Sequence, residues 1–382
     1  MKRFRLDRAN LIGLGFILGG LAIYLWAVHR GWDLPPTDAH NSRQAQTAIT
    51  AQMLHEDGFS TLTPFNGLGP PWSVPMEFPT YQILVAAVAG VTNGDVITSG
   101  RLVGVLGTFL LVAALGLILR RADLDLPVMA VGIAILLTAP LWIIFSRAIL
   151  IESFAAALAA WWLAGLLETL SSEQPNRKWI VTTLLLGVIA ALTKVTSFAV
   201  VLPAGAIVTW ISFRRHGRSR LIGAGLVTLP GILAAVLWNG YADAVKQAHP
   251  YANFLTSENL SAWNWGTISQ RLDPAWWSRI FQHLNLIFPW WWWGIIAAGA
   301  AVGSSRHRSG IALSVIVLGT GPLAFANLYY VHNYYLMAVA PAAVVAMTLS
   351  LAALKQRWSG SPPAMASLVL GCIVLIGLQV LG

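Results

Sequence analysis

The sequence has little charge: only 10% of its 382 residues are Asp, Glu, Lys or Arg, whereas 57% are apolar. Soluble domains carry about 25% charged residues, so a chain of this length and composition could not cover a water-facing surface. An intrinsically disordered chain is excluded as well, because such chains are poor in apolar residues. The composition therefore predicts an integral membrane protein.

Cysteine and nucleotide-binding motifs are also scarce. Cys372 is the single cysteine, which excludes a disulfide framework and a metal site built from cysteines. The sequence contains no P-loop and no Rossmann glycine pattern, so we expect no nucleotide cofactor. The formal net charge of +9 would indicate nucleic acid as the partner of a soluble protein. In a membrane protein it reports which side of the bilayer the basic loops occupy, and we expect no nucleic-acid partner.

Long apolar runs recur through the chain. A spanning helix requires about 20 mostly apolar residues, because the backbone must satisfy its own hydrogen bonds in hydrocarbon. The runs predict an all-α polytopic membrane protein with about eleven spans, forming a single membrane domain over residues 1–382 with large outer loops at 29–101 and 239–283. The predicted spans are Asn10–Val28, Leu102–Leu119, Val128–Phe145, Ser153–Leu170, Ile180–Leu192, Val195–Phe213, Leu221–Trp238, Leu284–Val302, Gly310–Asn327, Tyr335–Leu354 and Ala364–Leu381.

The basic loops predict the orientation. The first run is too long for the core of a signal peptide and no Ala-x-Ala site follows it, so we expect a retained anchor with a cytoplasmic N-terminus. Alternation of the spans then places 16 of the 24 Lys and Arg residues on the cytoplasmic side and ten of the fifteen acids outside, as the positive-inside rule favours. This requires the apolar run at residues 78–90 to be an interfacial or re-entrant helix, since it has only about 13 residues. We therefore expect an inner (plasma) membrane protein whose chemistry is extracytoplasmic.

The first outer loop contains two candidate acids. Asp38 precedes residues 45–54, which have helical character and would lie along the membrane surface. Capping of that helix is the alternative role for Asp38. Glu77 precedes the short apolar run; buried in lipid it would require a partner or a bound cation, whereas solvation at the interface is the simpler alternative.

Further candidates stand at the outer ends of the predicted spans. Arg147 and Glu152 share a tight turn between two spans, where an ion pair across the turn is the structural alternative. Lys194 separates two apolar runs, so it either contacts a phosphate or extends to the interface. His332 lies among four tyrosines, and an interfacial aromatic belt explains the tyrosines better than it explains the histidine.

These residues are all predicted to lie at one face of the membrane. Acids that activate an acceptor and cations that bind phosphate are what transfer from a lipid-linked phosphate donor requires. The candidates are Asp38, Glu77 and Glu152 as catalytic acids, and Arg43, Arg147, Lys194 and His332 as donor-phosphate ligands.

The same segments resemble a known family. The resemblance is carried by TDAHNSRQAQTA, MEFPTYQ, GRLVGVL, SRAILIES, ALTK and VHNYYLMAVAP, in this order. They resemble polytopic glycosyltransferases of the GT-C fold, close to the family 39 group of protein O-mannosyltransferases and lipid A aminoarabinose transferases. The resemblance implies an inverting transfer of a sugar from a polyprenyl-phosphate donor to a hydroxyl of a lipid, glycan or protein acceptor outside the cytoplasm.

The resemblance also implies residue roles. Asp38 matches the first-loop catalytic acid that positions or deprotonates the acceptor, and Glu77 matches the acid of a Glu-Lys-Pro segment that lies near a divalent cation in some members. Glu152 matches the acid of the second outer turn, and Lys194 matches a lysine that contacts the donor phosphate. A divalent cation near Glu77 is thus an optional cofactor.

The chain departs from the family pattern at two positions. Ala39 follows Asp38, where protein mannosyltransferases usually carry Glu, and this weakens the expectation of a protein acceptor. Phe78 replaces the Lys of the Glu-Lys-Pro segment. Binding of the donor phosphate would therefore shift to Arg43, Arg147 or Lys194.

Other classes of membrane protein remain as alternatives. A transporter or flippase of a lipid-linked or anionic substrate is the main one, although transporters place polar residues at the bilayer midplane and here the ionisable residues gather at one boundary. A polymerase or ligase of lipid-linked glycans would share the donor chemistry without the first-loop pattern. A non-catalytic scaffold would tolerate replacement of Asp38 by Asn.

Overall fold

The computed structural model describes residues 8–36, 40–58, 74–171, 176–249 and 251–381. Within these ranges every regular element is a helix, so the predicted all-α fold class is confirmed. The first half comprises α1 (Arg8–Arg30), α2 (Asn41–Asp57), α3 (Thr80–Thr92), α4 (Val96–Arg121), α5 (Leu126–Leu137), α6 (Pro140–Ser146), α7 (Glu152–Ser171), α8 (Arg177–Thr193), α9 (Val195–Ala199) and α10 (Leu202–His216). The second half comprises α11 (Arg218–Ala248), η1 (Asn253–Leu255), α12 (Ser261–Trp265), α13 (Ile268–Leu272), α14 (Pro274–Leu284), α15 (Trp290–Val302), α16 (Ser305–Ala324), α17 (Ala326–Val331), η2 (Asn333–Ala338), α18 (Ala340–Arg357) and α19 (Pro362–Leu381).

The structure does not confirm the predicted number of eleven membrane spans. Among the described residues six helices are long and apolar enough to cross a membrane, or seven if one bent pair counts as a span. That pair is α5 and α6, which the sequence predicted as one continuous span and which meet at 62°. Pro140 begins α6; because proline has no N–H and restricts the preceding residue, it breaks the helix there.

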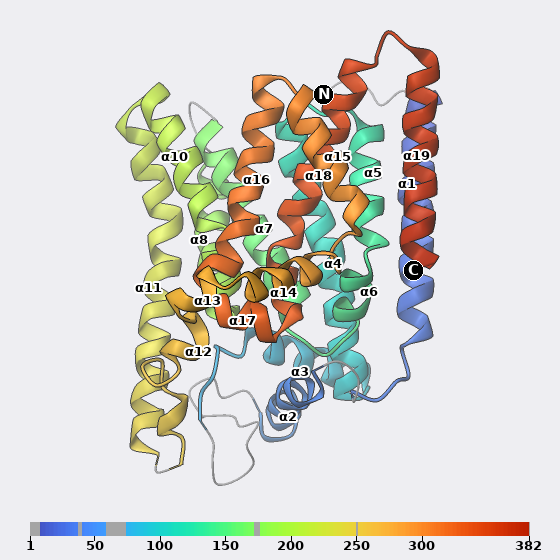
Figure 1. The fold of residues 1–382 in the computed structure, drawn as a ribbon. Coiled ribbons are helices and arrows are strands. Elements are labelled where there is room, and N and C mark those ends of the chain that lie inside the picture. The colour runs from blue at the N-terminus through green and yellow to red at the C-terminus, as the bar shows by residue number, and fades with distance from the viewer. Residues whose placement is uncertain (1–7, 37–39, 59–73, 172–175, 250, 382) are drawn as a thin grey trace.

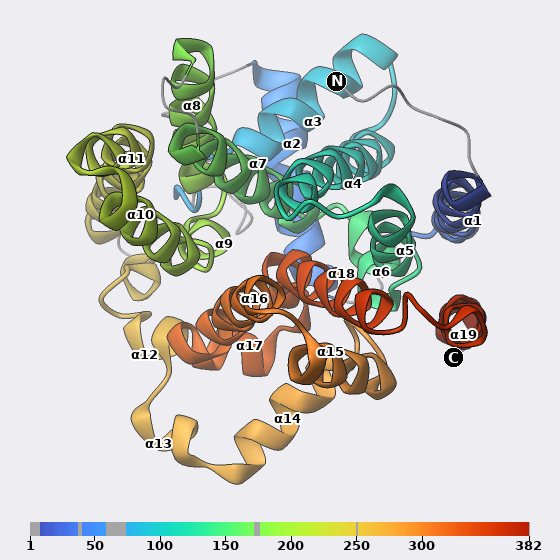
Figure 2. The same cartoon turned by 90° about the horizontal axis from the view of Figure 1, so that it is seen from above.

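The long helices run side by side, whereas α12, α13 and α14 run across the bundle (Figure 1). Seen along the bundle, α4, α7, α8 and α11 lie in one half and α15, α16 and α18 in the other, with α1 and α19 at one edge (Figure 2). Glycine permits close packing in the first half: a Cβ at Gly231 of α11 would lie 2.6 Å from the carbonyl oxygen of Gly187 in α8. Small residues at helix contacts are typical of membrane bundles.

The loops predicted to share the cytoplasmic side lie at one end of the bundle. Ion pairs join them: Arg121 pairs with Glu168, and Lys355 pairs with Asp125. The opposite end carries α2 and α3, which pack against each other. The short helix predicted at residues 78–90 is α3, with 13 residues. Which end faces the cytoplasm stays a prediction.

Candidate functional site

The first outer loop reaches the site through α2. His40 precedes α2 as its N-cap residue in the left-handed region, at φ 58°, and no side chain caps the helix there. Arg43, in the first turn, forms an ion pair with Glu77 at 2.5 Å between Nη2 and Oε1, and its Nη1 donates a hydrogen bond to Gln46. Glu77 therefore has a fixed partner in addition to its position at the helix entrance. Asp38 lies outside the described residues, and its role stays a prediction.

A second ion pair is fully buried. The Lys194 ammonium group contacts the carboxylate of Glu152, and the two residues are only 6% and 1% exposed. Glu152 is the first residue of α7, and Lys194 has an extended backbone at the break between α8 and α9. The alternative of an ion pair across the turn is wrong, because packing of α7 on α8 brings Lys194 to Glu152 in place of Arg147. The alternative in which Lys194 extends to water is wrong as well, since this side chain is buried.

Aromatic rings cover the buried pair and connect it to the first loop. The Lys194 Nζ lies 4.2 Å from the ring centroid of Tyr335 and 5.2 Å from that of Tyr334. His40 packs edge-on against Tyr334, with centroids 4.6 Å apart, and its Nε2 hydrogen-bonds Asn333 Oδ1 at 2.8 Å. The residue two positions after Asp38 therefore contacts the ring that faces Lys194.

His332 joins this group from the segment between α17 and η2. Its ring stacks on Tyr334 at 5.2 Å and meets the ring of His40 at 5.4 Å. Burial lowers the pKa of His332 to about 4, and the nearby charges of His40, Lys194 and Arg43 act in the same direction. At neutral pH His332 is therefore uncharged and would offer a phosphate a hydrogen bond rather than a positive charge.

The pKa of the Glu77 carboxyl group is shifted in the opposite direction from that of an isolated buried acid. Burial alone would raise the pKa of its carboxyl group, but the charge of Arg43, with smaller contributions from a backbone hydrogen bond and Lys194, lowers it. The same ion pair raises the pKa of Arg43 against the effect of its own burial. Both groups are therefore charged at neutral pH.

Arg147 lies apart from the other candidates. Its guanidinium packs against Gly31, the residue that follows α1. A Cβ added at Gly31 would lie 1.1 Å from Arg147 Nη1. Arg147 does not line the cavity described next. Its predicted role in binding the donor phosphate has no support from its position.

A cavity of about 370 Å³ opens between the α8–α9 break, α11, α12 and α17. Among the described residues that line it are three cations and one carboxylate, and we call it the polar cavity. Tyr335 and the buried Lys194 form part of its wall, while Glu152 lies behind Lys194. The charged lining residues are Arg43, Glu77, Lys194 and Lys246.

The polar cavity offers a metal ion few ligands. Among the described residues no three His, Cys, Asp or Glu side chains gather as metal ligands. The Glu77 carboxylate is already engaged by Arg43. Among the described residues the lining does not supply the ligand set of a divalent cation, and a metal ion near Glu77 stays a prediction.

Sequence reasoning missed Lys246 as a site residue. The predicted span ended at Trp238, whereas α11 continues to Ala248. Trp238, Ala242 and Lys246 stand at i, i+4 and i+8, the spacing of one helix face. That spacing was the available signal.

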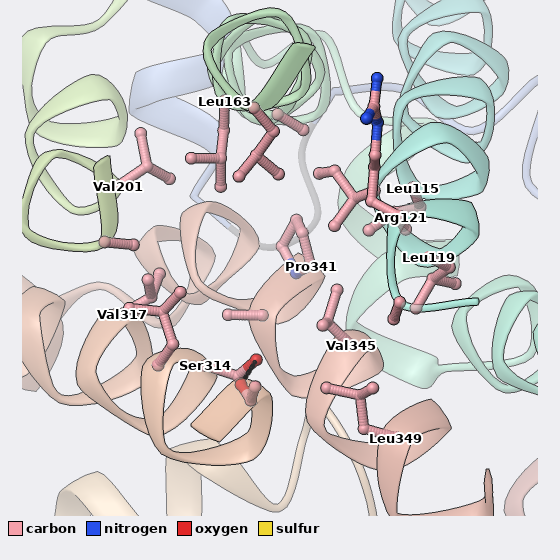
Figure 3. Close-up of a pocket in the computed structure, with 18 of the residues that line it drawn as sticks. Leu115, Leu119, Arg121, Leu163, Val201, Ser314, Val317, Pro341, Val345 and Leu349 are labelled. Atoms are coloured by element: carbon pink, nitrogen blue, oxygen red, sulfur yellow. Dashed lines mark hydrogen bonds between the residues drawn. The ribbon is translucent and has the colours of Figure 1, made fainter. Parts of the chain in front are cut away.

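A second cavity, of about 250 Å³, lies between α4, α7, α10, α16 and α18, and we call it the apolar cavity. Figure 3 shows aliphatic side chains such as Leu163, Val201, Val317 and Val345 pointing toward one another around it. Among the described lining residues, charge occurs near one end alone, where Arg121 is paired with Glu168 and Arg306 with Asp123. The polar and apolar cavities share two chain segments. In one segment Ala199 lines the polar cavity and Val201 lines the apolar cavity. In the other, Tyr335 lines the polar cavity and Ala338 lines the apolar cavity.

This geometry agrees with the comparisons to known proteins. Residues 66–239 match the family description "Dolichyl-phosphate-mannose-protein mannosyltransferase", a segment that holds Glu77, Glu152 and Lys194. The chain has the fold of ArnT from Cupriavidus metallidurans: against the structure bound to undecaprenyl phosphate the TM-score is 0.60 at 18% identity, covering 94% of this chain and 63% of that one. Against ArnT in the apo state the TM-score is 0.56 at 16% identity, covering 91% and 61%. No curated protein matches the chain.

The class is therefore that of multi-pass membrane proteins with a GT-C fold, similar to the mannosyltransferase and ArnT group, as the sequence motifs predicted. The chain spans somewhat less than two thirds of the ArnT chain that it resembles.

Proposed function

We propose that the protein is a membrane glycosyltransferase that moves a sugar from a polyprenyl-phosphate donor to an acceptor hydroxyl, with inversion at the anomeric carbon. The observation that carries this proposal is the convergence of two ion pairs, Arg43–Glu77 and Lys194–Glu152, at one cavity from four distant parts of the chain. Undecaprenyl phosphate in the similar ArnT structure supports the same class of donor here.

The proposed reaction is a single displacement. The acceptor oxygen forms a bond to the anomeric carbon while the bond from that carbon to the phosphate oxygen breaks. The electron pair of the broken bond leaves with polyprenyl phosphate, and a carboxylate takes the acceptor proton. The leaving phosphate gains negative charge, which cations fixed beforehand at the cavity wall stabilise.

The residues divide between these tasks. Lys194 and Arg43 are the proposed phosphate ligands, and Glu152 and Glu77 hold those cations in place through their ion pairs. Asp38 is the proposed general base, an assignment that rests on the family resemblance. General-base catalysis typically contributes about 10² to 10⁴ in rate. His332 does not line the polar cavity, and its neutral ring is proposed to position Tyr335, which does, through their ring contact at 6.2 Å.

The apolar cavity is proposed to hold part of the polyprenyl chain. Its wall continues from the same two segments, at Val201 and Ala338, that carry Lys194 and Tyr335 to the polar cavity. A phosphate at Lys194 with an attached isoprenoid chain would thus have an adjacent apolar space. The chain would leave one apolar environment, the bilayer, for another, so packing contacts rather than transfer from water would hold it there.

The test uses purified protein in nanodiscs with a panel of polyprenyl-phosphate sugars, and the released polyprenyl phosphate is measured. We expect release with at least one donor from the wild type, and about 100-fold less from D38N and from K194M, in keeping with loss of a general base or of charge stabilisation. R279M is the matched control, because Arg279 is an exposed cation on α14 away from the cavity. Absence of release with every donor, together with movement of the lipid across liposome membranes, would favour the transporter.

A further inference from the structure

Lys246 belongs to the face of α11 that contacts the Glu77 segment. On that face the Trp238 indole donates a hydrogen bond to the carbonyl oxygen of Met76 at 2.9 Å, and its ring meets the ring of Phe78 at 4.9 Å. Two turns further along the same face, the Lys246 residue is 8% exposed and lines the polar cavity. The segment around Glu77 is therefore fixed against a helix that also carries a cation into the cavity.

Lys246 differs from the other two cations in how its charge is compensated. Lys194 contacts the Glu152 carboxylate and the ring of Tyr335, and Arg43 has Glu77 and Gln46 as partners. These two cations are each engaged directly by an acceptor of the protein.

The partner of Lys246 is more distant. Its Nζ lies 3.8 Å from Asp243 Oδ1, which is beyond hydrogen-bond distance, and that oxygen already accepts a hydrogen bond from the backbone N–H of Ser257 at 3.0 Å. No described residue accepts a hydrogen bond from Lys246. The ammonium group therefore presents to the cavity donors that no described residue accepts, and an anion from outside the protein would complete them.

We propose that Lys246 binds a lipid-attached phosphate in the polar cavity and is a third substrate-binding cation beside Arg43 and Lys194. The identity of the ligand rests on the proposed function, which places a phosphate in this cavity. Two lipids could present such a group: the polyprenyl phosphate of the donor, or a phosphorylated lipid acceptor. Lys246 would then supply from α11 the charge that Phe78, packed on Trp238, does not supply from the Glu77 segment.

The experiment compares wild type with K246M, K246R and the matched control R279M in phosphatidylcholine nanodiscs. Binding of undecaprenyl phosphate and of undecaprenol is measured for each by native mass spectrometry. We expect K246M to weaken binding of undecaprenyl phosphate about tenfold, the effect of losing one hydrogen bond to a charged group, while binding of undecaprenol stays unchanged. K246R and R279M should bind both lipids as wild type does. Melting temperatures identify any variant that fails to fold, and K246R then decides whether charge alone accounts for the binding.

A second arm identifies the source of the phosphate. Phosphatidic acid replaces undecaprenyl phosphate in the same assay. Loss of affinity in K246M for undecaprenyl phosphate assigns Lys246 to the donor, and loss for phosphatidic acid alone assigns it to an acceptor lipid. Unchanged affinity of K246M for both lipids would overturn the proposal.

The outcome is separable from that of the proposed function. Wild-type protein that binds undecaprenyl phosphate through Lys246 but releases none from any sugar donor would refute glycosyl transfer and leave the Lys246 site intact. Protein that transfers sugar while K246M binds and reacts like wild type would refute the Lys246 proposal alone.

Discussion

The polar and apolar cavities are neighbours of similar size with opposite chemistry. The polar cavity, about 370 Å³, has Arg43, Lys194 and Lys246 in its wall, whereas the apolar cavity, about 250 Å³, has aliphatic walls and only neutralised charge near one end. The proposed donor, with a charged head and an isoprenoid tail, would occupy both cavities together. Buried charge is costly unless it is paired, and Lys194 at the polar cavity has Glu152 as its partner.

The largest expected effect comes from breaking the buried pair at the polar cavity. K194M leaves the Glu152 carboxylate buried without its cation, which should destabilise the protein by about 3–5 kcal/mol. It should also lower sugar transfer by about 100-fold, because the charge on the leaving phosphate loses a stabilising cation. Thermal unfolding followed by tryptophan fluorescence measures the first effect, and release of polyprenyl phosphate the second.

The double variant K194M/E152Q separates structure from chemistry. Removal of both charges should restore most of the stability and none of the activity. A double variant as active as wild type would show that this pair only supports the fold.

The next effect comes from the more exposed pair in the same cavity. E77Q should lower transfer by about tenfold and stability by about 1–2 kcal/mol, because Arg43 loses a charged hydrogen-bond partner but keeps contact with water. The lowered pKa of Glu77 means that its contribution is complete above its ordinary value near 4.5 and disappears only as the pH falls through the lower folded value. Rate measured from pH 8 down to pH 5 should show no step due to Glu77. E77Q with wild-type activity would contradict this account of the pair.

A smaller effect is expected at the apolar cavity, and it should depend on the length of the lipid. A160F places a ring into this cavity from α7, so KM for an undecaprenyl-linked donor should rise about tenfold, which corresponds to about 1.4 kcal/mol of lost packing contacts with the isoprenoid chain. KM for a geranyl-linked donor should stay unchanged. L110F, at a position on α4 that is 41% exposed, is the control. Equal effects of A160F on KM for long and short donors would show that the apolar cavity does not bind the lipid chain.

The smallest effect concerns His332 and pH. Its folded pKa of about 4 lies below its ordinary value of 6.5, so the unfolded state binds more protons between these values and stability falls as the pH drops through that window. H332N cannot be protonated and should lose less stability than wild type between pH 7 and pH 5, by about 1 kcal/mol after allowance for its partial exposure. Unfolding curves at the two pH values decide this. Parallel losses in wild type and H332N would show that the ring is not held in its neutral form.

The sequence predicted the helical membrane fold and the short helix before α4, because apolar runs and their lengths are local properties of a chain. It could not predict how ionisable residues pair. Glu152 pairs with Lys194, 42 residues away, in place of Arg147 within the same turn, because packing of α7 and α8 decides which groups meet. Lys246 escaped notice since its helix extends ten residues past the predicted span.

Paramagnetic relaxation shows whether the polar cavity holds the lipid phosphate. Cys372 is first replaced by Ala. A cysteine that carries the spin label is then introduced in place of Leu260, which lines the polar cavity, or in place of Ile118, which lines the apolar cavity. The ³¹P relaxation of undecaprenyl phosphate in nanodiscs is then measured for each protein. We predict strong enhancement from the label at Leu260 and little from the label at Ile118. Stronger enhancement from Ile118, or none from either label with lipid bound, would contradict the claim.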